Sequence, residues 1–239
     1  MEFKTSCAYS QGRSHRRNDT PCQDRAECHI FENSCLAIVT DGAGSKAEAE
    51  KSAEICCRIT AEFFSIYDCS LSAEEIGNIL TDKLNLGFED EYGYINTNDY
   101  GSTLLFVFAD NEGRCVVGHV GDGAVFLKKD GLWQRFSEPE NGRFINETFF
   151  VPTEDLGDHL RISTVTVSQG DCFILTSDGL SELLYDETTE TPAEACEIMN
   201  TLVREKSSSE SRSVLENEME NYFSEYTADD MSVAVIALV

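Results

Sequence analysis

Several short segments of the chain are apolar at nearly every position, and this pattern constrains the fold more than any other feature. They include residues 36–40, 104–109, 115–120, 172–176 and 231–239. A strand that is apolar on both faces must be covered on both, so these segments predict sheets with neither face open to water. Helical segments elsewhere in the chain can supply the outer layers, and a sandwich of sheets and helices is the economical architecture.

Turn and capping signals divide the rest of the chain. Residues 102–134 read as short strands separated by Asn-Glu-Gly, Gly-Asp-Gly and Asp-Gly turns, which predicts one antiparallel meander. Ser45 with Glu48, and Ser72 with Glu75, have the spacing of a capping box and predict helices that begin there. Two further helices are expected near Thr191-Pro192 and after residue 209.

The charge of the chain narrows the choice of partners. Lys and Arg number 18 against 44 Asp and Glu, for a net charge of −26. A field of that sign repels phosphate backbones and anionic lipids, so general binding of nucleic acid or of a membrane surface is not expected. The one basic cluster lies within the first 30 residues.

Ten cysteines raise the question of a disulfide scaffold. The first residues contain no apolar run typical of a signal peptide, and we therefore expect a cytoplasmic protein with reduced thiols. Cysteines with apolar neighbours, such as Cys35, Cys115 and Cys172, are expected to act as small buried hydrophobes. The adjacent Cys56 and Cys57 are expected to pack within a helix.

Four aspartates stand where an apolar segment ends or begins, namely Asp41, Asp122, Asp178 and Asp229. Each alone is explained by turn chemistry, and three of them precede a glycine. Together they suggest more, because strands of one sandwich can bring several carboxylates to one rim, where their repulsion requires cations. Hard divalent ions bind through such oxygens, so these residues predict a Mg²⁺ or Mn²⁺ site.

An acidic metal site of this kind points to the hydrolysis of phosphate esters. Two divalent ions about 4 Å apart can activate water and stabilise an oxyanion during in-line displacement. A nearby guanidinium would bind the phosphate through two parallel hydrogen bonds. The basic cluster of Arg13, Arg16, Arg17 and Arg25 surrounds Asp24 in the sequence, so the arginines and the carboxylates are expected at one site.

A series of motifs runs along essentially the whole chain. It comprises Ser14-His15 with Pro21-Cys22-Gln23-Asp24, TDGAGS at 40–45, GST at 101–103, GHVGDGA at 118–124, NETFF at 146–150, TSDGLSE at 176–182 and DDMSVAVI at 229–236. This series resembles the PP2C-type (PPM) metal-dependent serine/threonine protein phosphatases, and in particular their compact bacterial branch. The resemblance implies a single domain over residues 1–239 with an α+β fold, a four-layer αββα sandwich of two antiparallel sheets flanked by helix pairs.

The implied activity is hydrolysis of phosphoserine and phosphothreonine by direct attack of a metal-activated water. By position, Asp41 resembles the carboxylate that bridges both metals, and the Gly42 carbonyl resembles a ligand of the second. Asp178 and Asp229 resemble the remaining aspartates of the first metal. Asp122 is similar to the residue that helps to hold a third metal. The implied cofactors are thus two Mg²⁺ or Mn²⁺ ions, with a third bound more weakly.

Two positions depart from the family pattern. The family's Glu-Asp pair is Gln23-Asp24 here. Asp24 is similar to the acid that orders the attacking water, whereas Gln23 offers the second metal at most a neutral amide oxygen, and weaker binding is expected. Where the family commonly has a phosphate-binding Arg, this chain has Asp19.

Four residues are candidates to replace that arginine: Arg13, His15, Arg16 and Arg17. For His15 two roles stay open. It can stabilise a turn, or it can protonate the leaving alkoxide, a task suited to the pKa of imidazole.

These residues are compatible with three functions. The leading one is a bacterial, cytoplasmic, monomeric phosphatase that acts on a phosphorylated protein, with a cognate Ser/Thr kinase as a further partner. The second is a catalytically weak or inactive pseudo-phosphatase that serves as a regulatory binding module. Gln23 favours it, whereas the retention of Asp41, Asp178 and Asp229 speaks against it. The third is a metallohydrolase for small phosphorylated molecules. The loop at 137–159 is expected near the active site, either in contact with substrate or as a packed surface loop.

Overall fold

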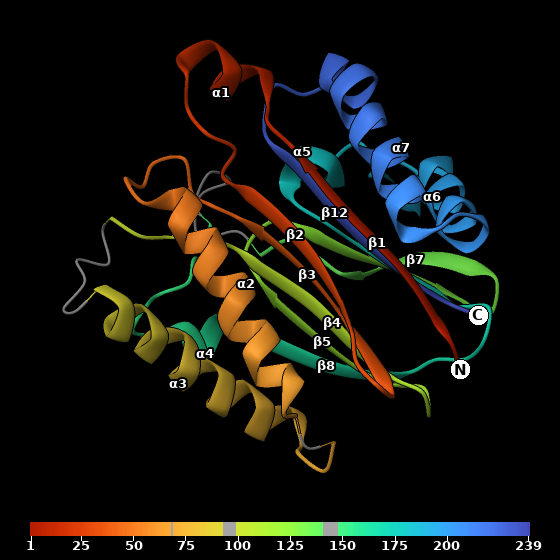
Figure 1. Cartoon of the computed structure of the whole chain (residues 1–239), viewed down its shortest axis with the longest axis horizontal. Coiled ribbons are helices and arrows are strands. Elements are labelled where there is room, and N and C mark those ends of the chain that lie inside the picture. The colour runs from red at the N-terminus through yellow and green to blue at the C-terminus, as the bar shows by residue number, and fades with distance from the viewer. Residues whose placement is uncertain (68, 93–98, 141–147) are drawn as a thin grey trace.

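Two five-stranded antiparallel sheets lie face to face in the computed structural model, which describes residues 1–67, 69–92, 99–140 and 148–239 (Figure 1). The first sheet contains, in spatial order, β1 (Phe3–Ser10), β12 (Met231–Leu238), β9 (Cys172–Thr176), β6 (Ala124–Lys129) and β7 (Leu132–Ser137). The second contains β2 (Asp24–Ile30), β3 (Ser34–Asp41), β4 (Leu104–Asp110), β5 (Arg114–Val120) and β8 (Arg161–Thr166).

Two pairs of helices form the outer layers. The second sheet is covered by α2 (Ala49–Ser65) and α3 (Ala73–Tyr92), and the first by α6 (Glu194–Glu205) and α7 (Ser208–Asn221). The smaller elements are α1 (Arg13–Asn18), α4 (Leu156–His159), α5 (Asp178–Ser181), a 3₁₀ turn at Phe223–Glu225, and a two-stranded ladder of β10 (Tyr185–Asp186) and β11 (Thr191–Pro192). The predicted four-layer α+β sandwich is confirmed. In the described part of the chain, none of the helices combines the length and apolarity that crossing a membrane requires.

The double burial of the strands explains their continuous apolar runs. In β4, Leu105 packs between the two sheets with Val39 and Phe173. Its neighbours Leu104 and Phe106 point the other way, into the layer beneath α2 and α3. Because successive side chains of a strand face opposite sides, both sets must be apolar.

The prediction of one meander over residues 102–134 is wrong. β4 pairs with β5 in one sheet, whereas β6 pairs with β7 in the other. The intervening Gly-Asp-Gly is therefore a crossing between sheets, and Gly121 has a φ of 107° there. A Cβ at Gly121 would lie 2.5 Å from Cγ2 of Thr103, so the crossing requires glycine. The crossing places Asp122 at the rim of the sandwich.

The two capping predictions have opposite outcomes. Before α3, the Ser72 hydroxyl accepts the Glu75 N–H and the Glu75 carboxylate accepts the Ser72 N–H, which confirms the capping box. The box at Ser45 is wrong, because α2 begins at Ala49 and Glu48 provides no side-chain cap. The backbone of 43–48 bonds instead to residues 99–101, through the N–H groups of Ala43 and Glu48.

The cysteines behave as predicted. None of the ten, all of which lie in the described part of the chain, forms a disulfide, and Cys35, Cys56, Cys57, Cys115 and Cys172 are buried. Burial raises the pKa of the Cys172 thiol well above its ordinary value, so this sulfur is a packing group and not a nucleophile.

Candidate active site at one rim of the sandwich

Three of the predicted aspartates meet at one rim. Asp41 is the last residue of β3, Asp122 lies in the crossing from β5 to β6, and Asp178 follows β9 as the first residue of α5. Each offers one carboxylate oxygen, and these oxygens all lie within 4.8 Å of one another. Three strands from two sheets therefore deliver their terminal carboxylates to one point.

Asp24 joins this group from the neighbouring strand. It opens β2 directly opposite Asp41 in the ladder, and only 1% of its surface is exposed. Burial raises the pKa of Asp24 to about 7, although the nearby hydroxyls of Ser177 and Ser232 act to lower it. Both carboxylate oxygens of Asp24 are buried without a hydrogen-bond partner among the described residues. Asp24 is thus a buried carboxyl group that lies among the other carboxylates and polar side chains of the rim.

The charges at the rim disfavour one another. Burial, together with the charges of Asp24 and Asp178, holds the pKa of Asp41 well above its ordinary value. The pKa of Asp178 rises to about 7 because of burial and of the charges of Asp122 and Asp229. These carboxylates cannot all be ionised at neutral pH unless cations compensate them.

Gln23 adds a neutral oxygen to the rim. Its backbone carbonyl accepts the Gly42 N–H at 3.1 Å, which fixes the residue beside the turn that follows Asp41. Its side-chain Oε1 is buried and has no hydrogen-bond partner among the described residues. A buried acceptor without a donor is costly, so this amide oxygen suits a cation or an ordered water.

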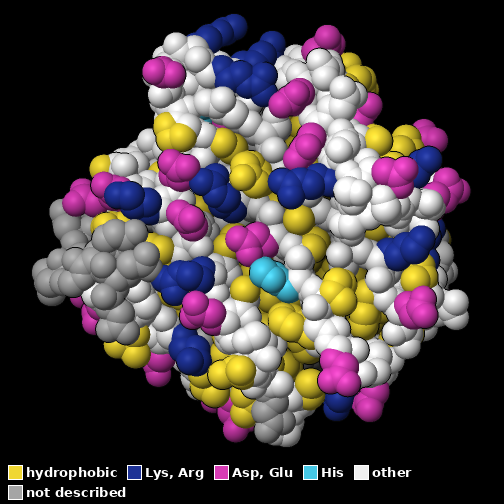
Figure 2. Space-filling view, in the orientation of Figure 1, with side chains coloured by type: hydrophobic (Ala, Val, Ile, Leu, Met, Phe, Trp, Pro, Cys, Tyr) yellow, Lys and Arg dark blue, Asp and Glu magenta, His cyan; other side chains and the backbone are white. Residues whose placement is uncertain are grey.

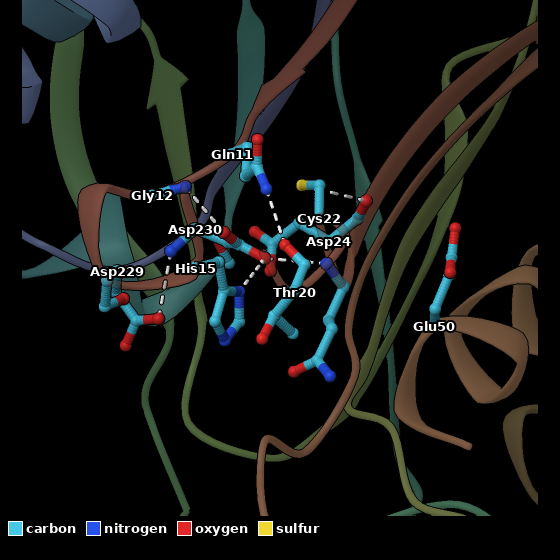
Figure 3. A network of polar contacts seen from close by, with 12 residues as sticks. Gln11, Gly12, His15, Thr20, Cys22, Asp24, Glu50, Asp229 and Asp230 are labelled. Carbon is cyan, nitrogen blue, oxygen red and sulfur yellow. Dashed lines mark hydrogen bonds and ion pairs between the residues drawn. The ribbon is translucent and has the colours of Figure 1, made fainter. Parts of the chain in front are cut away.

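Asp229 lies beside this cluster but is not one of its three members. Its residue is exposed, and its Oδ1 accepts the backbone N–H of Asp230 at 2.9 Å (Figure 3). Its charge nevertheless raises the pKa of Asp178, so the two carboxylates are electrostatic neighbours. The assignment of Asp229 as a metal ligand stays a prediction.

The adjacent Asp230 has a role that the sequence-based prediction did not assign. It is 2% exposed, and its carboxylate accepts the N–H groups of Gly12 and Gln23, each at 2.6 Å. Nδ1 of His15 lies 2.9 Å from Oδ2 of the same carboxylate (Figure 3). The doubled aspartate before an apolar strand was the available signal. Asp230 ties α1, the start of β2 and the start of β12 together.

The arginines of α1 lie on its exposed side. Arg13 donates to the carbonyl of Thr227 at 3.3 Å and Arg16 to the hydroxyl of Ser10 at 3.2 Å. Neither contacts the carboxylate cluster, and Arg17 is exposed. The fourth basic residue, Arg25, pairs with Glu50. The assignment of the phosphate to an α1 arginine therefore stays a prediction.

A pocket of about 560 Å³ adjoins the cluster. Thr148 lines it and donates from its hydroxyl to Oδ2 of Asp122 at 2.5 Å. Phe149, Phe150 and Pro152 supply apolar walls. This pocket belongs to the predicted loop at 137–159, of which residues 141–147 lie outside the described residues.

The donor set is composed of oxygen atoms throughout. The carboxylates of Asp41, Asp122 and Asp178, with the unpartnered amide oxygen of Gln23, fit a hard divalent ion such as Mg²⁺ or Mn²⁺. The rise in the pKa of Asp41 and Asp178 fits the same interpretation, since a cation would relieve the repulsion that causes it. The rim therefore has the chemistry of a site for metal-assisted hydrolysis.

Comparison with known proteins gives consistent results. The family model of protein phosphatase 2C matches residues 11–221. Serine/threonine-protein phosphatase 3 of Escherichia coli (strain K12) is 26% identical over 176 residues, which cover 70% of this chain and 69% of that protein.

Among solved structures, the catalytic domain of the serine/threonine phosphatase PstP in complex with two manganese ions is 17% identical, with a TM-score of 0.67, over 99% of this chain and 98% of that one. RsbX in complex with magnesium is 15% identical, with a TM-score of 0.61, over 99% and 96%. These likenesses show a shared fold.

Proposed function

Because this chain belongs to the protein phosphatase 2C family, we propose that it is a catalytically active, metal-dependent hydrolase that removes phosphate from phosphoserine and phosphothreonine in proteins. The observation that carries the proposal is the cluster of Asp41, Asp122 and Asp178, whose crowded charges call for a cation. The relatives named above as phosphatases, and those solved with manganese or magnesium, support it.

The rim residues would hold the metal. We assign Asp41, Asp122 and Asp178 as its principal ligands, with Gln23, Gly42 and Asp229 as further oxygen donors. When bound, Mg²⁺ or Mn²⁺ supplies Lewis-acid activation of water and of the phosphate at neutral pH.

The chain's own side chains orient the reactants. Asp24, buried opposite Asp41, can accept a hydrogen bond from the attacking water and fix its direction. Asp230 accepts Nδ1–H of His15 and so holds the imidazole. A protonated His15 then has Nε2–H left to donate to the serine or threonine oxygen as the ester bond breaks, which is the role of a general acid.

We also propose the substrate, partner, location and oligomeric state of this enzyme. Its substrate is a phosphorylated protein, its kinase partner is a cognate Ser/Thr kinase, and it acts as a cytoplasmic monomer. Gln23, in place of the family's glutamate, predicts that the second metal binds more weakly than the first.

The proposal is tested with an aryl phosphate and with phosphothreonine peptides, with and without Mn²⁺. We expect wild-type protein to hydrolyse both with Mn²⁺ and to gain thermal stability from the ion, whereas Asp178→Asn should lose both effects. Hydrolysis that is absent with Mn²⁺, or that survives Asp178→Asn unchanged, would contradict it.

One observation favours the alternative of a pseudo-phosphatase. Gln23 removes a charge from the predicted second metal site, and a single metal can be insufficient for turnover. Under this alternative Mn²⁺ would stabilise the wild-type protein without any hydrolysis, so the two readouts of the same experiment separate the two functions.

A further inference from the structure

The three arginines of α1 lack acidic partners among the described residues. Arg204 also lacks one, but its guanidinium donates to the Asn200 side chain and to three backbone carbonyls. Six other arginines of the described chain each form an ion pair with a carboxylate: Arg25, Arg58, Arg114, Arg135, Arg161 and Arg212. Arg13, Arg16 and Arg17 form none with any described residue, and neither does Asp19 at the end of their own helix. In a chain with 44 acidic residues, three adjacent unpaired arginines leave a cationic surface open.

Helix geometry places these arginines on one side of α1. Successive residues turn by about 100°, so positions 13, 16 and 17 share a face. His15 is rotated about 200° from Arg13 and lies on the inner side, where it meets Asp230. The space-filling view shows Lys and Arg side chains gathered at the tip that α1 forms in Figure 1 (Figure 2). The face defined by Arg13, Arg16 and Arg17 is called the α1 arginine face below.

The helix that carries this face is fixed to the rim. The backbone N–H and the hydroxyl of Ser14 both donate to the carbonyl of Ala228, at 2.9 and 2.6 Å. The N–H of Gly12 donates to Asp230. A Cβ at Gly12 would come within 2.3 Å of the backbone of Asp229, so α1 packs directly on the segment that leads to the site.

The arginines are anchored lightly. Arg13 and Arg16 make one hydrogen bond each, at 3.3 and 3.2 Å, out of the five donors that a guanidinium offers. The remaining donors match carboxylate or phosphate groups in a bidentate manner. At physiological ionic strength charges beyond about 8 Å are screened. Near α1 the three arginines outnumber the exposed carboxylates of Asp19 and Asp229, and the distant negative charge of the chain has little effect on a bound peptide.

We infer that the α1 arginine face recognises acidic groups flanking the phosphoserine or phosphothreonine of the substrate, and does not bind the phosphate that is removed. The preferred substrate is therefore an acidic or multiply phosphorylated segment. This inference rests on the proposed function, because it deepens the choice of substrate at the same site.

The experiment compares two phosphothreonine peptides that differ only in their flanks, four aspartates in one and four lysines in the other. With Mn²⁺ and the wild-type protein we expect the KM of the acidic peptide to be about tenfold lower. Reversing the face with Arg13→Glu, Arg16→Glu and Arg17→Glu should invert that preference through KM, with kcat values that change alike for both peptides. Raising the salt concentration should shrink the wild-type preference.

The matched control is Arg58→Glu with Lys83→Glu and Lys206→Glu, which changes the net charge equally at other surfaces and should keep the preference for the acidic peptide. Equal KM values for both peptides in the wild type would overturn the inference. So would an equal loss on both peptides in the α1 variant, which would mean that the arginines bind the phosphate that is removed.

Failure of the proposed function gives a different result, namely no hydrolysis of either peptide. In that case, fluorescence anisotropy of the labelled peptides still tests the face, because tighter binding of the acidic peptide depends on the three arginines and not on turnover. If the triple charge reversal does not fold, the triple change to glutamine should bring the two dissociation constants together.

Discussion

Titratable side chains are buried in two regions of the molecule, the layer between the two sheets and the rim of the sandwich, and their charge states differ between the two. Between the sheets, His119 of β5 is fully buried, and its Nδ1 lies 2.7 Å from the hydroxyl of Ser137 on the facing sheet. Burial lowers its pKa to about 3, so it stays neutral.

At the rim, several carboxylates are crowded together, and burial with the charges of its neighbours raises the pKa of Asp41 and of Asp178. The titratable group between the sheets is therefore neutral, whereas the rim holds carboxylates whose repulsion a bound cation would relieve. This difference in how charge is buried is what singles out the acidic rim as the candidate functional site.

The largest effect should come from removing one rim charge. We expect Asp178→Asn to reduce Mn²⁺-dependent hydrolysis by more than about 100-fold, because losing even an outer partner of a metal ligand costs 10- to 100-fold. The same change should raise the melting temperature of the metal-free protein by about a few degrees, since it removes a repelling charge.

Enzyme kinetics and metal-free thermal unfolding measure the two effects. Asp82→Asn, at an exposed position of α3, is the control and should change neither. A metal-free variant that is less stable than wild type would contradict the proposed repulsion at the rim.

The opposite outcome is expected between the sheets. Phe173 is fully buried and packs edge to face on Phe136. Phe173→Ala should lower the free energy of unfolding by about 3–5 kcal/mol, with little change in activity per folded molecule. Urea unfolding measures the loss, and Phe173→Leu should cost less. A fall in kcat without a fall in stability would break the separation between the two regions.

The rim carboxyls and the histidine between the sheets should change the free energy of unfolding in opposite directions as pH rises. In the metal-free protein Asp24 and Asp178 have folded-state pKa values of about 7, above the ordinary value near 4. Between these values the folded state holds more protons, so each carboxyl lowers the free energy of unfolding by about 1 kcal/mol per unit of rising pH. His119, whose folded-state pKa is about 3, holds its extra proton when unfolded, and stability rises with pH at about the same slope up to about 6.5.

The measurement is urea unfolding of the metal-free protein from pH 4.5 to 6.5. Relative to wild type, His119→Gln should lose stability more steeply as pH rises, by about 1 kcal/mol per pH unit. Parallel curves would show that His119 does not titrate as its burial requires. Mn²⁺ should flatten the part of the slope that comes from the rim.

The smallest expected effect comes from changing the one neutral side chain among the candidate ligands at the rim. Gln23→Glu adds a charged ligand and should tighten Mn²⁺ binding by about tenfold, because ligand charge sets the affinity of such sites. Calorimetric titration measures it. Gln134→Glu, at an exposed position of β7, is the control. Unchanged affinity would mean that Gln23 is not a ligand.

Much of this arrangement could be predicted from the sequence, because continuous apolar runs fix strands with two buried faces. What those runs do not fix is the sheet to which each strand belongs. Residues 115–120 and 124–129 read as hairpin neighbours, yet they lie in different sheets, since Gly121 lets the chain cross. The crossing is a long-range packing outcome, and no local signal reports it.

The sequence predicted the charged residues of the candidate site but not the residues that hold them in position. Position at the end of an apolar segment was enough to predict Asp41, Asp122 and Asp178. It was not enough to predict Asp230, because the importance of that residue depends on segments far away in the sequence. α1 was also not predicted, since Arg13–Asn18 is polar on every side and has no apolar face to reveal a helix.

The hydrogen bonds that Asp230 accepts from the N-terminal segment have a consequence for the synthesis of the protein. Asp230 accepts hydrogen bonds from Gly12, 218 residues earlier, and from Gln23, 207 residues earlier. At 5–20 residues per second, a ribosome needs roughly 10–45 s to deliver Asp230 after Gly12. Throughout that time the nascent chain has its first rim carboxylates but not the strand that aligns them, so the candidate site is incomplete until β12 is translated and docked.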